Sequence, residues 1–194
     1  MAQQTVLVHK RWGDEELDVR EFVRPESYPV YQLSAHLDNP NLANFIENCR
    51  QYAVNTVRMA PGDPNIADWH RMQAYGRWGA VLSYYETDFW NYPSETITQG
   101  IGDCDDKSIL LVSLLRRRVS SNDVYCTIGK LADLGHMWVS VRIRGQWYTI
   151  ETTVDMPIRP ESHPYYPYFR FNDKQVDIAR PLSEIPMLHG GGGY

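Results

Sequence analysis

The sequence contains no long apolar run. Nowhere in its 194 residues do about 18 apolar residues follow one another, which is the length that predicts a membrane-spanning helix. The first residues, Met1 to Thr5, also lack the basic start and apolar stretch that are typical of a signal peptide. We therefore expect no membrane partner and a cytoplasmic location, and a place in a viral particle is compatible with both.

Cysteine is scarce, and positive charge does not dominate. The three cysteines, Cys49, Cys104 and Cys126, lie far apart, and their odd number does not predict a disulfide framework. The net charge of −5 argues against a nucleic-acid partner, because phosphate binding needs concentrated Lys and Arg. No Cys or His pair has zinc-ligand spacing, so we expect neither a metal nor a cofactor.

The remaining composition is that of a globular protein, with 43% hydrophobic and 22% charged residues. We predict three segments in one domain-sized chain. Residues 1–38 are an N-terminal arm or edge strands, with strand-like runs at Thr5–His9 and Leu17–Val23. Residues 39–155 form the core. Residues 156–194 are a proline- and aromatic-rich extension that ends in a flexible glycine tail.

Helical spacing of apolar residues dominates the first half of the core. It predicts one helix over Asn41–Met59, with Asn39 as the N-cap before Pro40, and a second helix over Asp63–Val81. The segment Glu86–Ile101 is rich in turn-forming residues and is expected to connect these helices to the next one.

A third helix and three strands follow. Apolar residues predict a helix over Cys104–Arg118 with one buried side, and Asp103 is its natural N-cap. Alternating patterns then predict strands over Val124–Ile128, His136–Ile143 and Trp147–Thr153. Helices followed by antiparallel strands indicate an α+β fold.

Cys104 is the strongest candidate for chemistry because it begins a helix. A thiol attacks as its thiolate, which the unpaired N–H groups and the positive end of a helix dipole stabilise. The flanking Asp103, Asp105 and Asp106 work against that charge unless they cap the helix or point away from the sulfur. A cation site is the other interpretation of these aspartates, but they lack the loop pattern of a calcium hand. His136 must then supply the main stabilisation.

The register of the predicted hairpin decides which acid lies beside His136. If Arg144-Gly145 is the two-residue loop, His136 and Glu151 are diagonal neighbours on one face, about 7–8 Å apart at Cα. A loop at Gly145-Gln146 would separate them by two further positions. We favour the first register because it completes a Cys–His–acid triad.

Three sequence blocks resemble the transglutaminase-like cysteine protease superfamily, which has a papain-like Cys-His-acid centre. They are Gly-Asp-Cys-Asp-Asp at 102–106, Gly-His-Met-Trp-Val at 135–139 and Trp-Tyr-Thr-Ile-Glu-Thr-Thr at 147–153. Residues 84–88 and 93–97 are similar to the lead-in that precedes the family's cysteine. The resemblance implies a papain/transglutaminase-like fold, in which the helix bearing the cysteine packs on an antiparallel β-sheet that carries the histidine and the acid. It assigns nucleophile, base and third member to Cys104, His136 and Glu151.

Two positions depart from the family pattern. Glu151 stands where the family usually has Asp, and its extra methylene moves the carboxylate by about one bond length. Met137 replaces a small residue beside the histidine and is expected to narrow the cleft.

The resemblance implies cysteine-dependent acyl transfer on amide substrates through a thioester intermediate. Protease, amidase and transglutaminase activities share this first half-reaction, and a protein or peptide is the expected substrate. The alternative is a non-catalytic transglutaminase-like module in a larger assembly. In that case the N-terminal arm or the C-terminal extension would contact an assembly partner.

Overall fold

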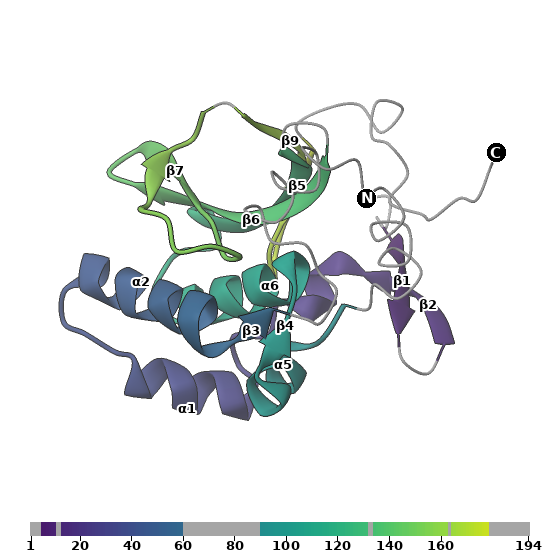
Figure 1. The fold of residues 1–194 in the computed structure, drawn as a ribbon, viewed down its shortest axis with the longest axis horizontal. Helices are drawn as coiled ribbons and strands as arrows, with labels where there is room; N and C mark the ends of the chain where they lie inside the picture. Colours follow the sequence, from purple (N-terminus) through teal and green to yellow (C-terminus); the bar gives the residue numbers. More distant parts are fainter. Residues whose placement is uncertain (1–4, 11–12, 60–89, 132–133, 163, 179–194) are drawn as a thin grey trace, which may run out of the picture.

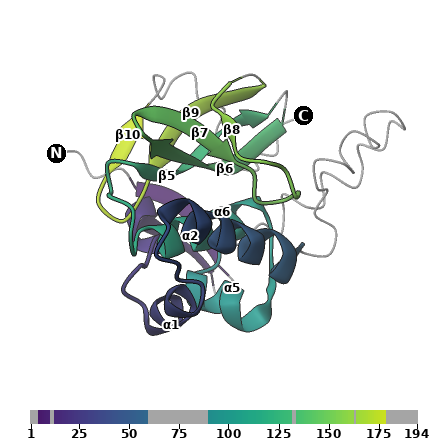
Figure 2. The same ribbon diagram turned by 90° about the vertical axis from the view of Figure 1, so that its left-hand side faces the viewer.

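A six-stranded antiparallel sheet lies against a layer of helices, which is the expected α+β arrangement (Figures 1 and 2). The structure is a computed structural model, and it describes residues 5–10, 13–59, 90–131, 134–162 and 164–178. The helix predicted at Asp63–Val81 and the glycine tail lie outside the described residues.

The sheet has the order β10-β9-β5-β6-β7-β8, and it curves over the helices in Figure 1. Its strands are β5 (Val124–Leu131), β6 (Leu134–Ile143), β7 (Gln146–Ile150), β8 (Arg159–Pro160), β9 (Tyr165–Phe171) and β10 (Val176–Ile178). The three strands predicted in the core are confirmed, with ends that differ by at most three residues. Strand β9, from the C-terminal extension, pairs with β5 inside this sheet.

Helix α6 (Cys104–Leu115) lies between the sheet and the other helices, which are α1 (Tyr28–His36), α2 (Leu42–Gln51) and α5 (Pro93–Gln99). Every residue of α6 after Cys104 is buried. The expectation of one buried side is therefore wrong, because a helix with neighbours all round it is buried all round. The helix also ends before the predicted Arg118. No helix in the described residues is long and apolar enough to cross a membrane.

The first predicted core helix is shorter than expected. Helix α2 starts after Asn41, not after Asn39, because the Asn41 side chain accepts the N–H groups of the first turn. It continues as a π-helical segment, Tyr52–Thr56, and the chain becomes extended at Val57. Strand β3 (Arg58–Met59) then pairs in parallel with β4 (Ile101–Gly102). That pairing takes the place of the predicted last helical turn.

Helix α5 occupies a segment that was predicted to be only turn-rich. Pro93 is its first residue, and Glu95 completes a capping box with the backbone N–H of Tyr92. Gly100 ends the helix at a φ of 63°, which glycine adopts without strain. The proline and the glycine that suggested turns are thus the start and stop signals of a short helix.

The N-terminal segment combines a hairpin with residues of the core. Strands β1 (Thr5–Lys10) and β2 (Gly13–Asp18) pair with each other. The strand predicted over Leu17–Val23 is wrong beyond Asp18, whose side chain accepts the N–H of Arg20 and starts a 3₁₀ turn. Val19, Phe22 and Val23, in and just after this turn, are buried in the same core as α6.

Candidate active site

The hairpin between β6 and β7 has the register that the sequence favoured. Its ladder runs from Ile143 opposite Gln146 to Val139 opposite Ile150. Arg144 and Gly145 form the two-residue turn at φ values of 52° and 84°, which is the backbone of the tight hairpin turn that follows the twist of the strands. The sequence-based register is therefore confirmed.

His136 and Glu151 meet at the end of this ladder. The distance from His136 Nε2 to Glu151 Oε2 is 2.9 Å, and the two side chains are only 9% and 2% exposed. The expected carboxylate–imidazole hydrogen bond is therefore present in the structure. With Glu151 ionised, Nε2 is the donor, which leaves Nδ1 as the second ring nitrogen. Asp155, the next acid after Glu151 in the sequence, instead pairs with Arg50 at 2.8 Å.

The Glu151 carboxylate is held at both oxygens. Oε1 accepts the backbone N–H groups of Thr152 and Thr153 at 2.9 Å each, and the Thr153 hydroxyl at 2.7 Å. Oε2 accepts the Tyr165 hydroxyl at 3.0 Å in addition to His136. Burial by itself would raise the pKa of Glu151, but His136 and the Thr153 donors outweigh it and lower the pKa to about 2. The acid is therefore an anion at every physiological pH.

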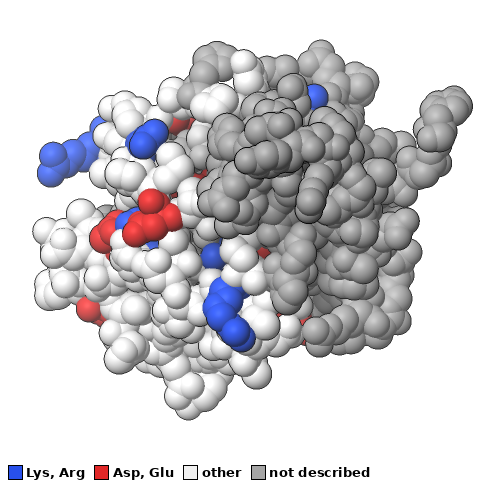
Figure 3. Space-filling view, in the orientation of Figure 1, with Lys and Arg blue, Asp and Glu red and all other residues white. Residues whose placement is uncertain are grey.

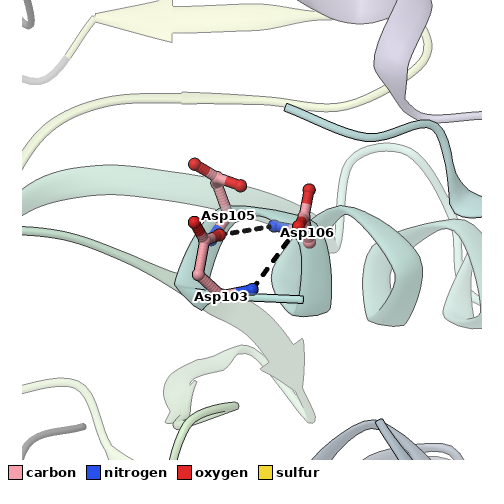
Figure 4. Close-up of side chains that lie close together, drawn as sticks. All are labelled: Asp103, Asp105 and Asp106. Carbon is pink, nitrogen blue, oxygen red and sulfur yellow. Dashed lines mark hydrogen bonds between the residues drawn. The ribbon is translucent and has the colours of Figure 1, made fainter. Parts of the chain in front are cut away.

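Cys104 is the first residue of α6, as the sequence predicted, and it is half-buried. Asp103 is the N-cap, and its carboxylate accepts the N–H groups of Asp105 and Asp106 (Figure 4). Asp106 in turn accepts the Asp103 N–H, so that the two aspartates form a capping box. Carboxylate oxygens of the three aspartates lie within 4.8 Å of one another. In Asp103 and Asp106 these oxygens are used for capping, which was the expected role.

Asp106 also anchors the segment before α5. Its carboxylate accepts the Asn91 backbone N–H at 2.7 Å and the Asn91 side-chain amide at 2.8 Å. Burial and the nearby Asp103 raise the pKa of Asp106 to about 8, against the effect of the Asn91 bonds. A carboxyl of raised pKa adds less negative charge beside Cys104, so this aspartate opposes a thiolate less than the sequence suggested.

Helix α6 contacts the sheet one turn after Cys104. The Ser108 hydroxyl donates to the Met137 carbonyl at 3.3 Å and pairs with the Thr152 hydroxyl at 3.1 Å. Met137 follows His136 directly, and Thr152 follows Glu151. Residues four apart lie on the same side of a helix, about 5–6 Å apart at Cβ. Ser108 therefore fixes the first turn of α6 at the end of the sheet where His136 and Glu151 meet.

Met137 and the other two cysteines are buried, whereas Cys104 is half-buried. Met137 is 3% exposed and belongs to the hydrophobic core, so the expectation that it narrows a cleft is wrong. Side chains alternate along a strand, and Met137 faces away from the side of His136. Cys49 and Cys126 are fully buried, and burial raises the pKa of Cys49 to about 12 and that of Cys126 well above its ordinary value.

Sequence reasoning missed three contributors to this site, namely Tyr165, Ser108 and Thr153. Ser108 carried a usable signal, because it is a hydroxyl four residues after Cys104 in an otherwise apolar helix. Thr153 lies in the block that resembles the family. Tyr165 carried none, because three tyrosines fall within residues 165–168 and no spacing rule selects one of them.

The described surface shown in Figure 3 carries basic and acidic side chains interspersed with each other. Several of the basic residues are paired with acids, such as Arg142 with Asp123 at 2.6 Å and Arg170 with Asp177 at 2.9 Å. This pairing reduces the positive charge that the described surface presents to an anionic partner.

Three solved structures of Legionella pneumophila LapG are similar to this chain. The EGTA-treated form is 17% identical, covers 82% of this chain and 88% of its own, and has a TM-score of 0.46. The calcium-bound form is 18% identical over 81% and 88%, with a TM-score of 0.44. A further LapG structure is 17% identical over 84% and 91%, with a TM-score of 0.46. No family model matches this sequence, and no curated protein matches it. The chain is thus similar to LapG at low identity.

Proposed function

We propose that the protein is a cysteine-dependent enzyme that transfers acyl groups from amide substrates through a thioester on Cys104. The observation that carries the proposal is the buried 2.9 Å hydrogen bond between His136 and Glu151. An anionic carboxylate fixes the tautomer of an imidazole and stabilises its protonated form. The helix that starts with Cys104 contacts the residues that directly follow this pair, Met137 and Thr152, through Ser108.

The proposed reaction uses the side chains of Cys104, His136 and Glu151 together with hydrogen-bond donors for the carbonyl oxygen. The Cys104 thiolate attacks the amide carbonyl carbon, and a C–S bond forms while negative charge develops on the carbonyl oxygen. The Cys104 backbone N–H, at the N-terminus of α6, is one proposed donor for that oxygen. We propose that residues 85–99 supply the second donor, and residues 85–89 of that segment lie outside the described part of the chain. As the C–N bond breaks, His136 gives its Nδ1 proton to the leaving amine.

The thioester is then consumed by a second nucleophile. His136 accepts a proton from water or from an amine, which attacks the thioester carbonyl, and the C–S bond breaks. The products are a carboxylic acid or a new amide, and the Cys104 thiolate and the His136 imidazolium are restored. Throughout, Glu151 stays ionised because its pKa is about 2. It therefore acts on His136 by charge and orientation rather than by accepting a proton.

The test is the rate at which iodoacetamide alkylates Cys104 between pH 5 and pH 9, followed by mass mapping. Cys49 and Cys126 are buried. A faster reaction at Cys104 than at these two cysteines would therefore not show that the Cys104 thiolate is stabilised. The reference is N-acetylcysteine at the same pH. We expect Cys104 to react at least about tenfold faster than this reference at pH 6, since a stabilised thiolate persists there.

The matched variant is His136→Ala, which should return Cys104 to the pH profile of the reference. Unaccelerated alkylation of Cys104, with no effect of His136→Ala, would contradict the proposal and favour the non-catalytic module. If the acceleration is found, incubation with a denatured protein substrate, with and without hydroxylamine, distinguishes water from an amine as the acceptor.

A further inference from the structure

Strand β9 changes its register with β5 beside the candidate site. Up to Ile128, which is opposite Phe169, the ladder is regular, but the next β5 residue, Gly129, is opposite Pro167. Tyr168 is therefore an extra residue on β9, and the strands form a β-bulge. Proline is tolerated in a strand at such a position, where the ladder is interrupted. Bulges occur beside active sites, where they change the direction of a side chain.

The bulge decides which of two adjacent tyrosines faces His136. Beyond it, Tyr165 is opposite Leu131, and Gly129 is opposite His136. Leu131, Gly129 and His136 share one face of the sheet because alternate residues and directly opposed residues do so. Without the extra residue, Tyr166 would take the place of Tyr165 on that face. A one-residue shift reverses the facing of every later side chain in a strand.

Gly129 makes this arrangement sterically feasible. A Cβ atom there would overlap the Tyr166 carbonyl oxygen and would lie 2.7 Å from a ring carbon of Trp138. The Trp138 ring in turn packs edge-on against Tyr165, with centroids 5.1 Å apart. It also lies over His136 at 6.3 Å. Tyr165 is therefore held by ring packing as well as by its hydroxyl.

The Tyr165 hydroxyl donates to Glu151 Oε2 at 3.0 Å, and this is the same oxygen that His136 contacts. Glutamate has one more rotatable bond than aspartate, so its carboxylate needs more restraint to keep one orientation. Thr153 restrains Oε1. In the described part of the chain, Oε2 forms hydrogen bonds with His136 and Tyr165.

We propose that Tyr165, directed by the β-bulge of β9, is a positioning residue that holds the Glu151 carboxylate in the orientation His136 requires. The inference rests on the proposed roles of Cys104, His136 and Glu151, and it extends the site into residues 156–194. Tyr165 acts through Glu151 and takes no part in bond making.

The test compares Tyr165→Phe with the control Tyr125→Phe in the alkylation assay, which needs no substrate. Tyr125 also donates its hydroxyl to a side-chain oxygen, that of Gln175 at 2.5 Å, but it lies at the start of β5, away from the end of β5 that pairs with Tyr165. We expect Tyr165→Phe to slow Cys104 alkylation at neutral pH by about tenfold, as for one hydrogen bond to a charged group. Its pH profile should move toward that of N-acetylcysteine, while Tyr125→Phe leaves both unchanged. Incorporation of 4-aminophenylalanine at position 165 keeps a donor and should restore the rate.

A second comparison isolates the positioning role. Glu151→Asp shortens the side chain and withdraws its carboxylate from Tyr165, so Tyr165→Phe should have almost no further effect in that background. If Tyr165→Phe is poorly folded, the 4-aminophenylalanine protein still tests the inference, because it keeps the ring and a donor and should react as fast as the unmodified protein.

The outcomes separate the inference from the proposed function. Unaccelerated alkylation in the unmodified protein means that the proposed Cys–His pair itself is wrong. Accelerated alkylation that Tyr165→Phe leaves unchanged overturns only the inference. A faster reaction in Tyr165→Phe also overturns it, because the hydroxyl would then compete with His136 for Glu151 rather than hold the carboxylate in place.

Discussion

At Glu151, both carboxylate oxygens accept more than one hydrogen bond, and all the donors are N–H or O–H groups. An aspartate is usual in the family that the sequence resembles, and the longer side chain raised the question of whether the acid still reaches His136. The structure places the carboxylate 2.9 Å from the ring. The extra length is accommodated by Thr153 on one side and Tyr165 on the other.

We expect Glu151→Gln to reduce both activity and stability. The amide lacks the charge that stabilises imidazolium, so turnover should fall steeply yet stay measurable while Cys104 and His136 remain. Its NH₂ group, itself a donor, must also lie against an N–H or O–H donor, which lowers the free energy of unfolding by about 1–3 kcal/mol. Glu151→Asp, which keeps the charge, should retain more activity than Glu151→Gln. Amide hydrolysis and urea unfolding measure the two effects, and unchanged activity in Glu151→Gln would rule out the orienting role.

The lowered pKa of Glu151 predicts how stability depends on acid pH. The carboxylate has a pKa of about 2 in the folded protein and an ordinary value of 4.5. The contribution of the ionised carboxylate to the free energy of unfolding is complete above pH 4.5. It is lost as pH falls toward 2, in total about 3 kcal/mol. The stability difference between the unmodified protein and Glu151→Gln should therefore shrink over that range. Urea unfolding at several pH values measures it, and a difference independent of pH would contradict the buried ion pair.

Cys104 offers a test of whether the residue is structural. It is a half-buried side chain at a helix start, so Cys104→Ala should abolish amide hydrolysis or transamidation and change the free energy of unfolding by less than about 1 kcal/mol. Cys126→Ala is the comparison, because Cys126 is fully buried in the core and its loss should cost more. A large loss of stability in Cys104→Ala would indicate a structural thiol.

At the scale of single elements, the ends and irregularities of strands and helices position the site. The capping box at Asp103 starts α6, and the two-residue turn at Arg144 sets the register of β6 and β7. The sequence signalled both features, because capping and turn residues act locally. The bulge in β9 was not predictable, because it depends on the close approach of β5, which is more than 30 residues away along the chain.

Gly129 and Gly135 form a matched pair for testing the bulge. A Cβ at Gly129 would overlap the backbone of β9, whereas a Cβ at Gly135 would meet no atom within 4 Å. We expect Gly129→Ala to destabilise the protein by about 2–4 kcal/mol, which exceeds the usual cost of a single substitution. Gly135→Ala should change stability by about 0.5 kcal/mol or less. Thermal and urea unfolding measure the change in stability of each variant. Equal effects of the two substitutions would show that the close approach of β5 and β9 at Gly129 is not essential.

At the scale of the whole molecule, ion pairs join the helical layer to the sheet. Arg116, at the C-terminal end of α6, contacts Asp173 between β9 and β10 at 2.6 Å, and both side chains are at most 13% exposed. Arg50 of α2 joins the segment after β7 by its contact with Asp155. These contacts link parts of the chain that are 57 and 105 residues apart.

The Arg116 pair should contribute more to stability than its neighbour on the helix. Removing one partner of a largely buried pair leaves a charge without compensation, so we expect Arg116→Ala to cost about 2–4 kcal/mol. Arg117 pairs with Glu26, whose side chain is 84% exposed, and Arg117→Ala should cost about 1 kcal/mol or less. The urea midpoints of the two variants measure the difference. Similar midpoints would mean that solvent screens the Arg116 pair as well.

The sequence by itself determined the features that depend on neighbouring residues. Alternation predicted the strands of the core, the cap at Asp103 predicted the start of α6, and the Arg144-Gly145 turn predicted that His136 and Glu151 share a face. Only the tertiary structure decided which groups surround that pair. Tyr165 reaches Glu151 because β9 pairs with β5, and Ser108 reaches Met137 because α6 packs on β6. Such contacts depend on packing between segments that are distant in the chain, which no local pattern of residues specifies.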